Sequence, residues 1–183
     1  MPIEKKIYQI KVSLTGSGPS IWRRIMIPGT TTLRQLHDII QIVMGWEDCH
    51  LHMFTINGQI YGDPEQDPDG EMGANDEGQL KLNQAVGEGS KFSYEYDFGD
   101  SWQHDLTVER ILPAEKGERY PLCVAGERAC PPEDAGGIGG YEDFLQAIAD
   151  PKHPEHSNYL EWAGGSFDAE QFDLEKVNDL LVR

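Results

Sequence analysis

The sequence is short of positive charge. Of its 183 residues, 15 are Lys or Arg and 32 are Asp or Glu, which gives a formal net charge of −17. A field of that sign repels phosphate backbones and anionic lipid headgroups. The composition therefore disfavours a protein that binds nucleic acid or a membrane surface by itself.

Cysteine is scarce, and long apolar runs are missing. The three cysteines, Cys49, Cys123 and Cys130, are odd in number and scattered along the chain. This usage suits a reduced compartment better than a disulfide framework. The opening MPIEKKIYQI has no apolar core of a signal peptide, and no later stretch approaches the roughly 18 apolar residues of a membrane span. We therefore expect a soluble, cytoplasmic protein with no membrane partner.

The sequence does contain enough apolar residues for a core. Hydrophobic residues make up 38% of the chain, with 4 Trp, 7 Tyr and 6 Phe. A chain of this length and composition forms a globular domain rather than a disordered segment. The acidity is uneven, because residues 1–60 carry a small positive net charge and residues 61–183 carry the acidic excess.

Hydrophobic periodicity predicts a chain that begins with the order ββαββ. Apolar and polar residues alternate over 7–14 and 21–27, which is typical of strands. Apolar residues recur every three or four positions over 33–44, after threonines that can cap a helix and before Gly45. The Asn57-Gly58 pair predicts a hairpin between strands at 50–56 and 59–61.

A second hairpin is predicted from two alternating segments, 92–98 and 102–109. A three-residue loop over 99–101 would place Phe98 opposite Trp102 and Tyr96 opposite His104. In this register His104 faces the core, and Asp97 points to the other face of the sheet.

The remaining segment is predicted to be less regular. Residues 113–140 are rich in Pro and Gly and are expected to cover the sheet, followed by a helix at 141–149. Asp168 and Gln171 resemble a capping box that starts a final amphipathic helix. The predicted fold class is α+β: a mixed sheet with a β-grasp-like start in residues 1–112, and a covering segment with C-terminal helices in 113–183, packed on the same domain.

Several motifs carry a family resemblance. In chain order they are IWRRIMIPGTTTLRQLHDIIQIVMGW, HLHMF, FSYEYDFGDSWQH, YPLCVAGERACPPEDAGGIGGYEDF and FDAEQFD. Together they resemble the plasmid pRiA4b ORF-3-like family over nearly the whole chain. The resemblance implies a protein of plasmids, insertion elements and chromosomes, and it implies no established activity. A serine recombinase is not supported, because the chain lacks a basic DNA-binding region.

The two most specific motifs, YDFGDSWQH and CPPEDAGGIGGY, contain the candidate binding residues. These are Asp97, Asp100, Trp102, Glu133 and Asp134. Closely spaced carboxylates near a histidine can bind a divalent ion or act as acid and base. The same carboxylates also suit turns and solvated loops, so both interpretations stay open.

A zinc site is the sharpest hypothesis from the sequence. Two thiols, Cys123 and Cys130, flank a Gly-containing loop that is expected to pack over the face where His104 points. His50 and His52, two residues apart on a predicted strand, project from one face, and one of the two, with His52 preferred, is the fourth ligand. Two thiols and two imidazoles are a ligand set that zinc accepts, although buried, inert thiols are the alternative.

The sequence contains no complete catalytic motif. We therefore expect a non-enzymatic acidic module that binds a protein partner or a small ligand. The alternative is a metal-dependent hydrolase or nuclease that uses the His, Asp and Cys residues named above. The enzyme requires those groups to converge on one pocket, whereas the binding module requires only an exposed surface.

Overall fold

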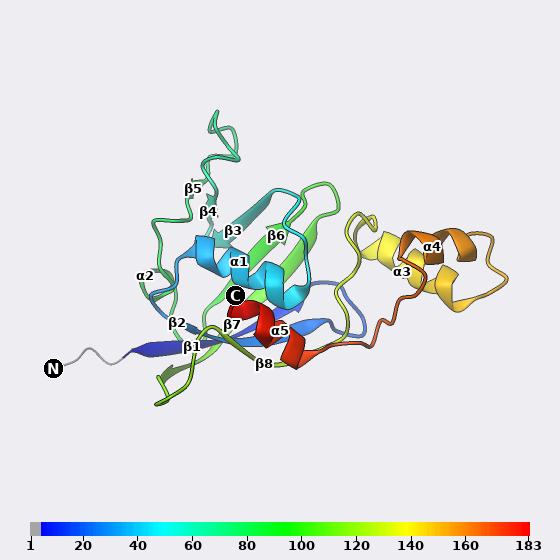
Figure 1. The fold of residues 1–183 in the computed structure, drawn as a ribbon. Helices are drawn as coiled ribbons and strands as arrows, with labels where there is room; N and C mark the ends of the chain where they lie inside the picture. The colour runs from blue at the N-terminus through cyan, green and yellow to red at the C-terminus, as the bar shows by residue number, and fades with distance from the viewer. Residues whose placement is uncertain (1–4) are drawn as a thin grey trace.

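The computed structural model describes residues 5–183, which form a twisted sheet covered by helices (Figure 1). Its strands are β1 (Lys6–Leu14), β2 (Trp22–Pro28), β3 (His52–Ile56), β4 (Gln59–Gly62), β5 (Asn75–Asp76), β6 (Lys91–Tyr96), β7 (Trp102–Pro113) and β8 (Leu122–Glu127). Its helices are α1 (Leu33–Met44), α2 (Leu82–Ala85), α3 (Gly137–Ala149), α4 (His156–Trp162) and α5 (Leu174–Leu181). The mixture confirms the predicted α+β class.

Within residues 5–183 the strands form one eight-stranded sheet in the order β5-β4-β3-β6-β7-β1-β2-β8. Neighbouring strands are antiparallel except β4 and β5, which are parallel, so the sheet is mixed as predicted. Strand β8 comes from the segment expected to be irregular, and it forms the edge beside β2.

Helix α1 lies across one face of this sheet (Figure 1). Leu36 and Ile40 are fully buried on the helix face that packs against the strands. The start is fixed by a capping box between Thr32 and Gln35, and the end by Gly45, whose φ of 109° is a left-handed value that favours glycine. The predicted helix over 33–44 is therefore confirmed at both ends.

A buried arginine, Arg23, caps the C-terminus of α1. The Arg23 guanidinium donates to the carbonyl oxygens of Val43 at 2.6 Å and Met44 at 3.3 Å, and it stacks on the ring of Phe172 with 4.1 Å between centres. Carbonyls at a helix C-terminus lack partners within the helix and carry partial negative charge. Arg23 thus ties β2, α1 and the C-terminal segment together.

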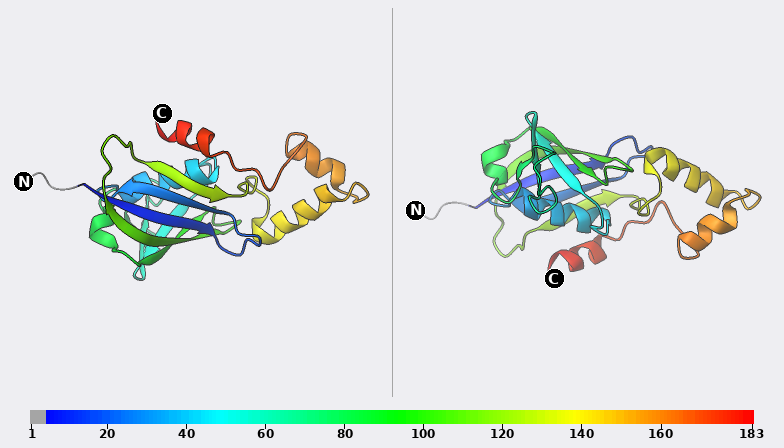
Figure 2. Two further views of the ribbon diagram at one scale, coloured as in Figure 1. Left: turned by 90° about the horizontal axis from the view of Figure 1, so that it is seen from below. Right: turned by 90° about the horizontal axis from the view of Figure 1, so that it is seen from above.

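The C-terminal helices lie in two places. Figure 2 shows α3 and α4 extending beyond the end of the sheet, whereas α5 returns to lie beside α1 and β8. The α3–α4 pair is held by Phe144, whose ring packs on those of Tyr159, Trp162 and Phe167.

Two predicted helix starts are wrong. Helix α3 begins at Gly137 rather than near residue 141, because Gly136 and Gly137 both adopt left-handed backbone angles and turn the chain into the helix. Helix α5 begins after Asp173, whose side chain accepts from the Lys176 amide, and not after Asp168. In the part of the chain that the structure describes, no helix is both long enough and apolar enough to cross a membrane.

The β6–β7 hairpin has a different register from the predicted one. Tyr96 pairs with Trp102 and Tyr94 with His104, so the connecting turn spans 97–101 instead of 99–101. The slip is two residues, an even number, so His104 still faces the core as predicted. Asp97, predicted to point away on a strand, lies instead in the turn at a φ of 59°.

Candidate functional site

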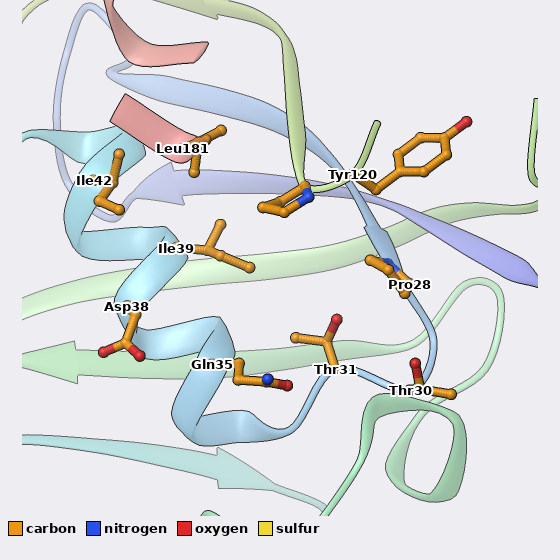
Figure 3. A pocket seen from close by; sticks show the side chains of 10 residues that line it. Pro28, Thr30, Thr31, Gln35, Asp38, Ile39, Ile42, Tyr120 and Leu181 are labelled. Carbon is orange, nitrogen blue, oxygen red and sulfur yellow. The ribbon is translucent and has the colours of Figure 1, made fainter. Parts of the chain in front are cut away.

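One feature that can receive a ligand is a pocket of about 470 Å³ beside α1 (Figure 3). It is enclosed by α1, the end of β2, the chain at Tyr120-Pro121 and the end of α5. None of the candidate binding or metal-ligating residues named from the sequence lines it.

A second feature is a group of polar side chains at the end of the sheet that faces α3. Three connecting segments meet there: residues 45–51 after α1, the β6–β7 turn at 97–101, and residues 130–136 before α3. They bring together four side chains, which we call the acidic rim: His50, Asp97, Glu133 and Asp134.

The rim is centred on one nitrogen atom. His50 Nε2 lies 2.8 Å from Asp134 Oδ1, 3.5 Å from Asp97 Oδ2 and 3.8 Å from Glu133 Oε2. The side chains of Asp97 and Glu133 are 10% and 12% exposed, whereas that of Asp134 is 68% exposed. The rim is therefore a partly enclosed anionic site that is open to solvent on the Asp134 side.

The turn at 97–101 aims Asp97 at this site. Asp97 Oδ1 accepts from the amides of Gly99 at 3.0 Å and Asp100 at 3.3 Å, which leaves Oδ2 for His50. The Asp97 amide donates to the carbonyl of Leu51 at 2.8 Å and ties the turn to the segment that carries His50. Aspartate tolerates the left-handed backbone of this turn and satisfies its amides.

Glu133 is held by one oxygen and free at the other. Its Oε1 accepts from the Tyr96 hydroxyl at 2.9 Å and the Glu47 amide at 2.8 Å. Its Oε2 is buried and, among the residues that the structure describes, has no hydrogen-bond partner. Burial raises the pKa of Tyr96 well above its usual value, as does the neighbouring Cys49. The phenol therefore stays protonated and keeps donating to Glu133.

Asp100 positions the rim from outside it. Its Oδ2 accepts from the Gly136 amide at 3.0 Å, next to the N-terminus of α3. A Cβ on Gly137 would lie 2.7 Å from the Asp100 carbonyl oxygen, so this contact requires glycine. The carboxylate complements the helix dipole and fixes residues 130–136 against the turn.

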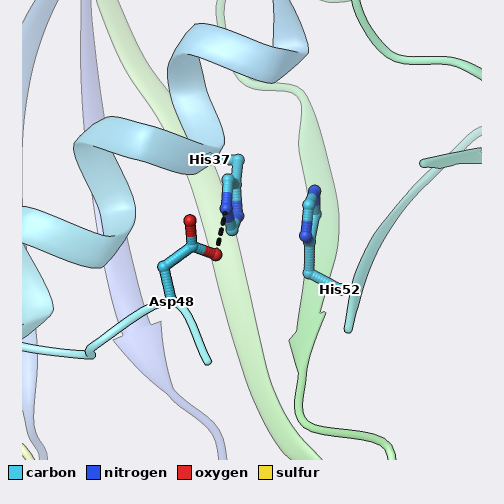
Figure 4. A group of neighbouring side chains, drawn as sticks. All are labelled: His37, Asp48 and His52. Carbon is cyan, nitrogen blue, oxygen red and sulfur yellow. Dashed lines mark hydrogen bonds and ion pairs between the residues drawn. The ribbon is translucent and has the colours of Figure 1, made fainter. Parts of the chain in front are cut away.

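A pair of buried histidines, His37 of α1 and His52 of β3, lies beside Asp48 of the segment 45–51 (Figure 4). The rings of His37 and His52 stack with centroids 3.5 Å apart. His37 Nε2 lies 2.9 Å from Asp48 Oδ1, and His52 Nε2 lies 2.8 Å from Glu77 Oε2. Burial, and secondly the neighbouring His52, lower the pKa of His37 to about 4.

This histidine pair is arranged for stacking rather than for a shared metal. Although His37, Asp48 and His52 place ligand atoms within 4.8 Å of one another, the two rings are nearly parallel, at 11°. The lone pair of an imidazole nitrogen lies in the ring plane, so parallel rings do not aim at one ion. The hydrogen bonds to Asp48 and Glu77 instead anchor the segments on either side.

The structure does not bring the predicted zinc ligands together. His104 uses both ring nitrogens, one with the Trp46 indole at 3.1 Å and one with the Tyr94 carbonyl at 3.2 Å. His52 is engaged by Glu77, and the Cys123 thiol donates to the Ala125 carbonyl. Among residues 5–183, no group of His, Cys, Asp and Glu with ligand atoms within 4.8 Å contains Cys123, Cys130 or His104.

Of the two thiols proposed as ligands, Cys123 is buried and Cys130 is half-buried. Burial raises the pKa of both Cys123 and Cys130, and the nearby Arg23 guanidinium only partly opposes this. The hydrogen bond of the Cys123 thiol to the Ala125 carbonyl fits the packing role that was the alternative interpretation.

Of the predicted binding residues, Asp97, Glu133 and Asp134 form the rim and Asp100 supports it. Trp102 is fully buried and packs on Trp46 with ring centroids 5.2 Å apart, so its side chain lies behind the site. The sequence reasoning missed Tyr96 as a hydrogen-bond donor and His37 as a buried partner. The sequence could have predicted that His37 is buried, because His37 falls in the apolar stripe of α1 beside Leu36.

Comparisons with known proteins agree over almost the whole chain. The model of the family described as "Plasmid pRiA4b ORF-3-like protein" matches residues 6–176. "Uncharacterized protein y4hQ" of Sinorhizobium fredii (strain NBRC 101917 / NGR234) is 37% identical over 174 residues, which span 94% of this chain and 89% of that protein. The crystal structure of a protein of unknown function, MM3350 from Methanosarcina mazei Go1, has 41% sequence identity and a TM-score of 0.85, covering 94% of this chain and 98% of that one.

Proposed function

This chain belongs to the plasmid pRiA4b ORF-3-like family, and from the geometry of its acidic rim we propose that it is a binding module that holds a divalent metal ion there. The observation that carries the proposal is the convergence of three carboxylates on His50 Nε2, within 2.8 to 3.8 Å. Ligand atoms bound to one ion at ~2.0–2.3 Å are themselves about 3 Å apart.

Electrostatics supports the same conclusion. Asp97, Glu133 and Asp134 crowd their negative charges into one partly enclosed site, and one imidazole is their shared partner. Within residues 5–183, no Lys or Arg forms an ion pair with any of the three. A bound cation would offset their mutual repulsion and would give the buried Glu133 Oε2 a partner.

The donor set favours a borderline metal over calcium or magnesium. One imidazole with carboxylates suits Zn²⁺, Mn²⁺ or Fe²⁺, whereas calcium takes oxygen ligands alone. The ligand atoms fall into two groups that share His50, each within 4.8 Å: His50 with Asp97 and Asp134, and His50 with Cys49 and Glu133. An ion held by the second group would gain the Cys49 thiol as a soft donor, which favours zinc. Because Asp134 is exposed, an ion at the rim would keep positions open for water or for an anionic group of a ligand or partner.

The test is calorimetric titration of chelator-treated protein with ZnCl₂ and with MnCl₂ at neutral pH. We expect one site per chain, and at least about a tenfold loss of affinity in His50→Ala and in Asp97→Asn, because each removes a ligand. His153→Ala is the matched control, since His153 lies outside the rim, and it should bind like the unaltered chain. Absence of binding, or equal affinity in His50→Ala, would overturn the proposal.

A second candidate function is metal-dependent hydrolysis. The opening on the Asp134 side favours it, because catalytic metal sites keep an open position for water. The metal-loaded protein would then cleave bis-(p-nitrophenyl) phosphate, and His50→Ala would remove that activity. Metal binding without turnover would leave the binding module as the function.

A further inference from the structure

The pocket beside α1 has the shape and chemistry of a second ligand site, independent of the rim. Its volume of about 470 Å³ falls in the range of small-molecule pockets. The apolar part of its wall comes from four segments of the chain, namely the end of β2, α1, the chain before β8, and α5 (Figure 3): Pro28, Ile39, Ile42, Pro121 and Leu181. These side chains would contact a hydrocarbon body.

The polar part of the wall is concentrated near the start of α1. Two hydroxyls, of Thr30 and Thr31, and the amide of Gln35 line one end of the pocket, and the Asp38 carboxylate lies beyond Gln35, at the other end from Thr30 (Figure 3). Gln35 Oε1 accepts from the Thr32 amide in the capping box, so its NH₂ group is available to a ligand. Asp38 is the one charged side chain in the lining, so the pocket attracts a positive group and repels an anion.

Asp38 is held at the mouth of the pocket rather than neutralised there. Its nearest cation is Arg34 Nη2, at 3.6 Å on the same exposed helix surface, where pairing is weak. Partial burial raises the pKa of Asp38, with Arg34 opposing the shift. Because Arg34 leaves the Asp38 carboxylate only weakly paired, a cation in the pocket would still be attracted to it.

The walls are fixed before any ligand arrives. Asn178 of α5 accepts from the Cys123 amide and donates to the Cys123 carbonyl, both at 2.8 Å, so α5 is fastened to β8. This contact places Leu181 across the pocket from α1. On the opposite side, the Leu82 amide donates to the Thr31 carbonyl at 2.9 Å and holds the turn after β2. A preformed pocket loses little conformational entropy on binding.

We propose that this pocket binds a small amphipathic organic amine, with its ammonium group on Asp38 and its hydrocarbon or aromatic body against Ile39, Pro121 and Leu181. Amine binding at this pocket needs no metal, so the proposal does not depend on whether the rim holds an ion.

Three compounds of similar size separate charge from apolar contact: 2-phenylethylamine, 2-phenylethanol and 3-phenylpropionate. Each is titrated into ¹⁵N-labelled protein at neutral pH, with amide resonances followed in nuclear magnetic resonance spectra. We expect the amine to bind at least about tenfold more tightly than the alcohol and the carboxylate not to bind, with shifts at Thr31, Ile39 and Leu181.

Two variants test the role assigned to Asp38. Asp38→Asn should reduce binding of the amine to that of the alcohol while leaving the alcohol unchanged, because only the charge is removed. Thr30→Arg, at an exposed position, should abolish amine binding by placing a cation at the pocket. Asp69→Asn, an exposed carboxylate in the loop after β4, is the matched control and should bind the amine normally.

Three results would overturn the proposal. The first is equal affinity for the amine and the alcohol in the unaltered chain. The second is shifts confined to residues outside the pocket, including the acidic rim. The third is amine binding that survives in both Asp38→Asn and Thr30→Arg.

Discussion

The indole nitrogen of Trp46 donates a hydrogen bond to Nε2 of His104 over 3.1 Å, inside the core next to the acidic rim. The other ring nitrogen of His104 donates to the carbonyl of Tyr94 at 3.2 Å, since a carbonyl oxygen can only accept. These two contacts fix a neutral imidazole protonated on Nδ1. They also fasten the start of the segment 45–51, which carries His50, to strand β7.

A first prediction follows from this neutral histidine. Burial lowers the pKa of His104 to about 4, and burial lowers that of His37 in the same way. Between pH 6.5 and about 4 the unfolded chain protonates these groups and the folded chain does not, so the free energy of unfolding falls as the pH falls through this window. The expected loss between pH 7 and 5 is about 2 kcal/mol per histidine.

Urea denaturation at pH 7, 6 and 5 measures this slope. His104→Gln should be less stable at every pH but should lose less stability between pH 7 and 5, because it removes one titrating group. A slope that is the same in His104→Gln and in the unaltered chain would contradict the assignment.

The sequence was sufficient for elements whose signals are local. Helix α1 carries its own start and stop, with Thr32, Gln35 and Gly45 within a few residues of its ends. The β6–β7 hairpin was predicted with the correct faces but the wrong register. Period-two alternation is unchanged by a slip of two residues, and only the left-handed angles at Asp97 and Ser101 distinguish the five-residue turn.

The site was less predictable because it is assembled over long distances in the sequence. Asp97, Glu133 and Asp134 were selected by residue type and motif, but their convergence on His50 depends on three segments meeting at one end of the sheet. The same limitation made the zinc ligand set fail. Residue type and the expected path of the Gly-containing loop assigned Cys123 to a metal, whereas in the structure its thiol donates to the Ala125 carbonyl.

A second prediction concerns the packing of α1. Leu36→Ala and Ile40→Ala should each lower the free energy of unfolding by about 2–5 kcal/mol, because both side chains are fully buried and a cavity would remain. Val182→Ala, which truncates an exposed aliphatic side chain near the C-terminus, should change it by less than about 0.5 kcal/mol. Unchanged urea midpoints in both core variants would refute this packing.

A third prediction compares two adjacent arginines. Arg23→Met leaves the carbonyls of Val43 and Met44 without their donor in the interior and should cost at least about 3 kcal/mol. Arg24→Met breaks a partly exposed ion pair with Glu109 and a contact of the guanidinium with the Trp22 ring, and it should cost about 1 kcal/mol. Denaturation of the two variants under one set of conditions measures the difference, and equal losses would contradict the capping role of Arg23.

The last prediction separates the rim from the thiols. If zinc binds at His50 and the rim carboxylates, saturation at about 100 times the dissociation constant stabilises the folded chain by about 3 kcal/mol. A domain of this size then melts about 5–10 °C higher, and excess chelator should reverse that shift. Differential scanning calorimetry with and without chelator should show the reversal in Cys123→Ser, because the Cys123 thiol donates to the Ala125 carbonyl and is not a ligand. His50→Ala should show no shift on zinc addition and none on chelation, because its folded state lacks the nitrogen on which the carboxylates converge. A chelator effect lost in Cys123→Ser and kept in His50→Ala would place the metal at the thiols and refute the rim.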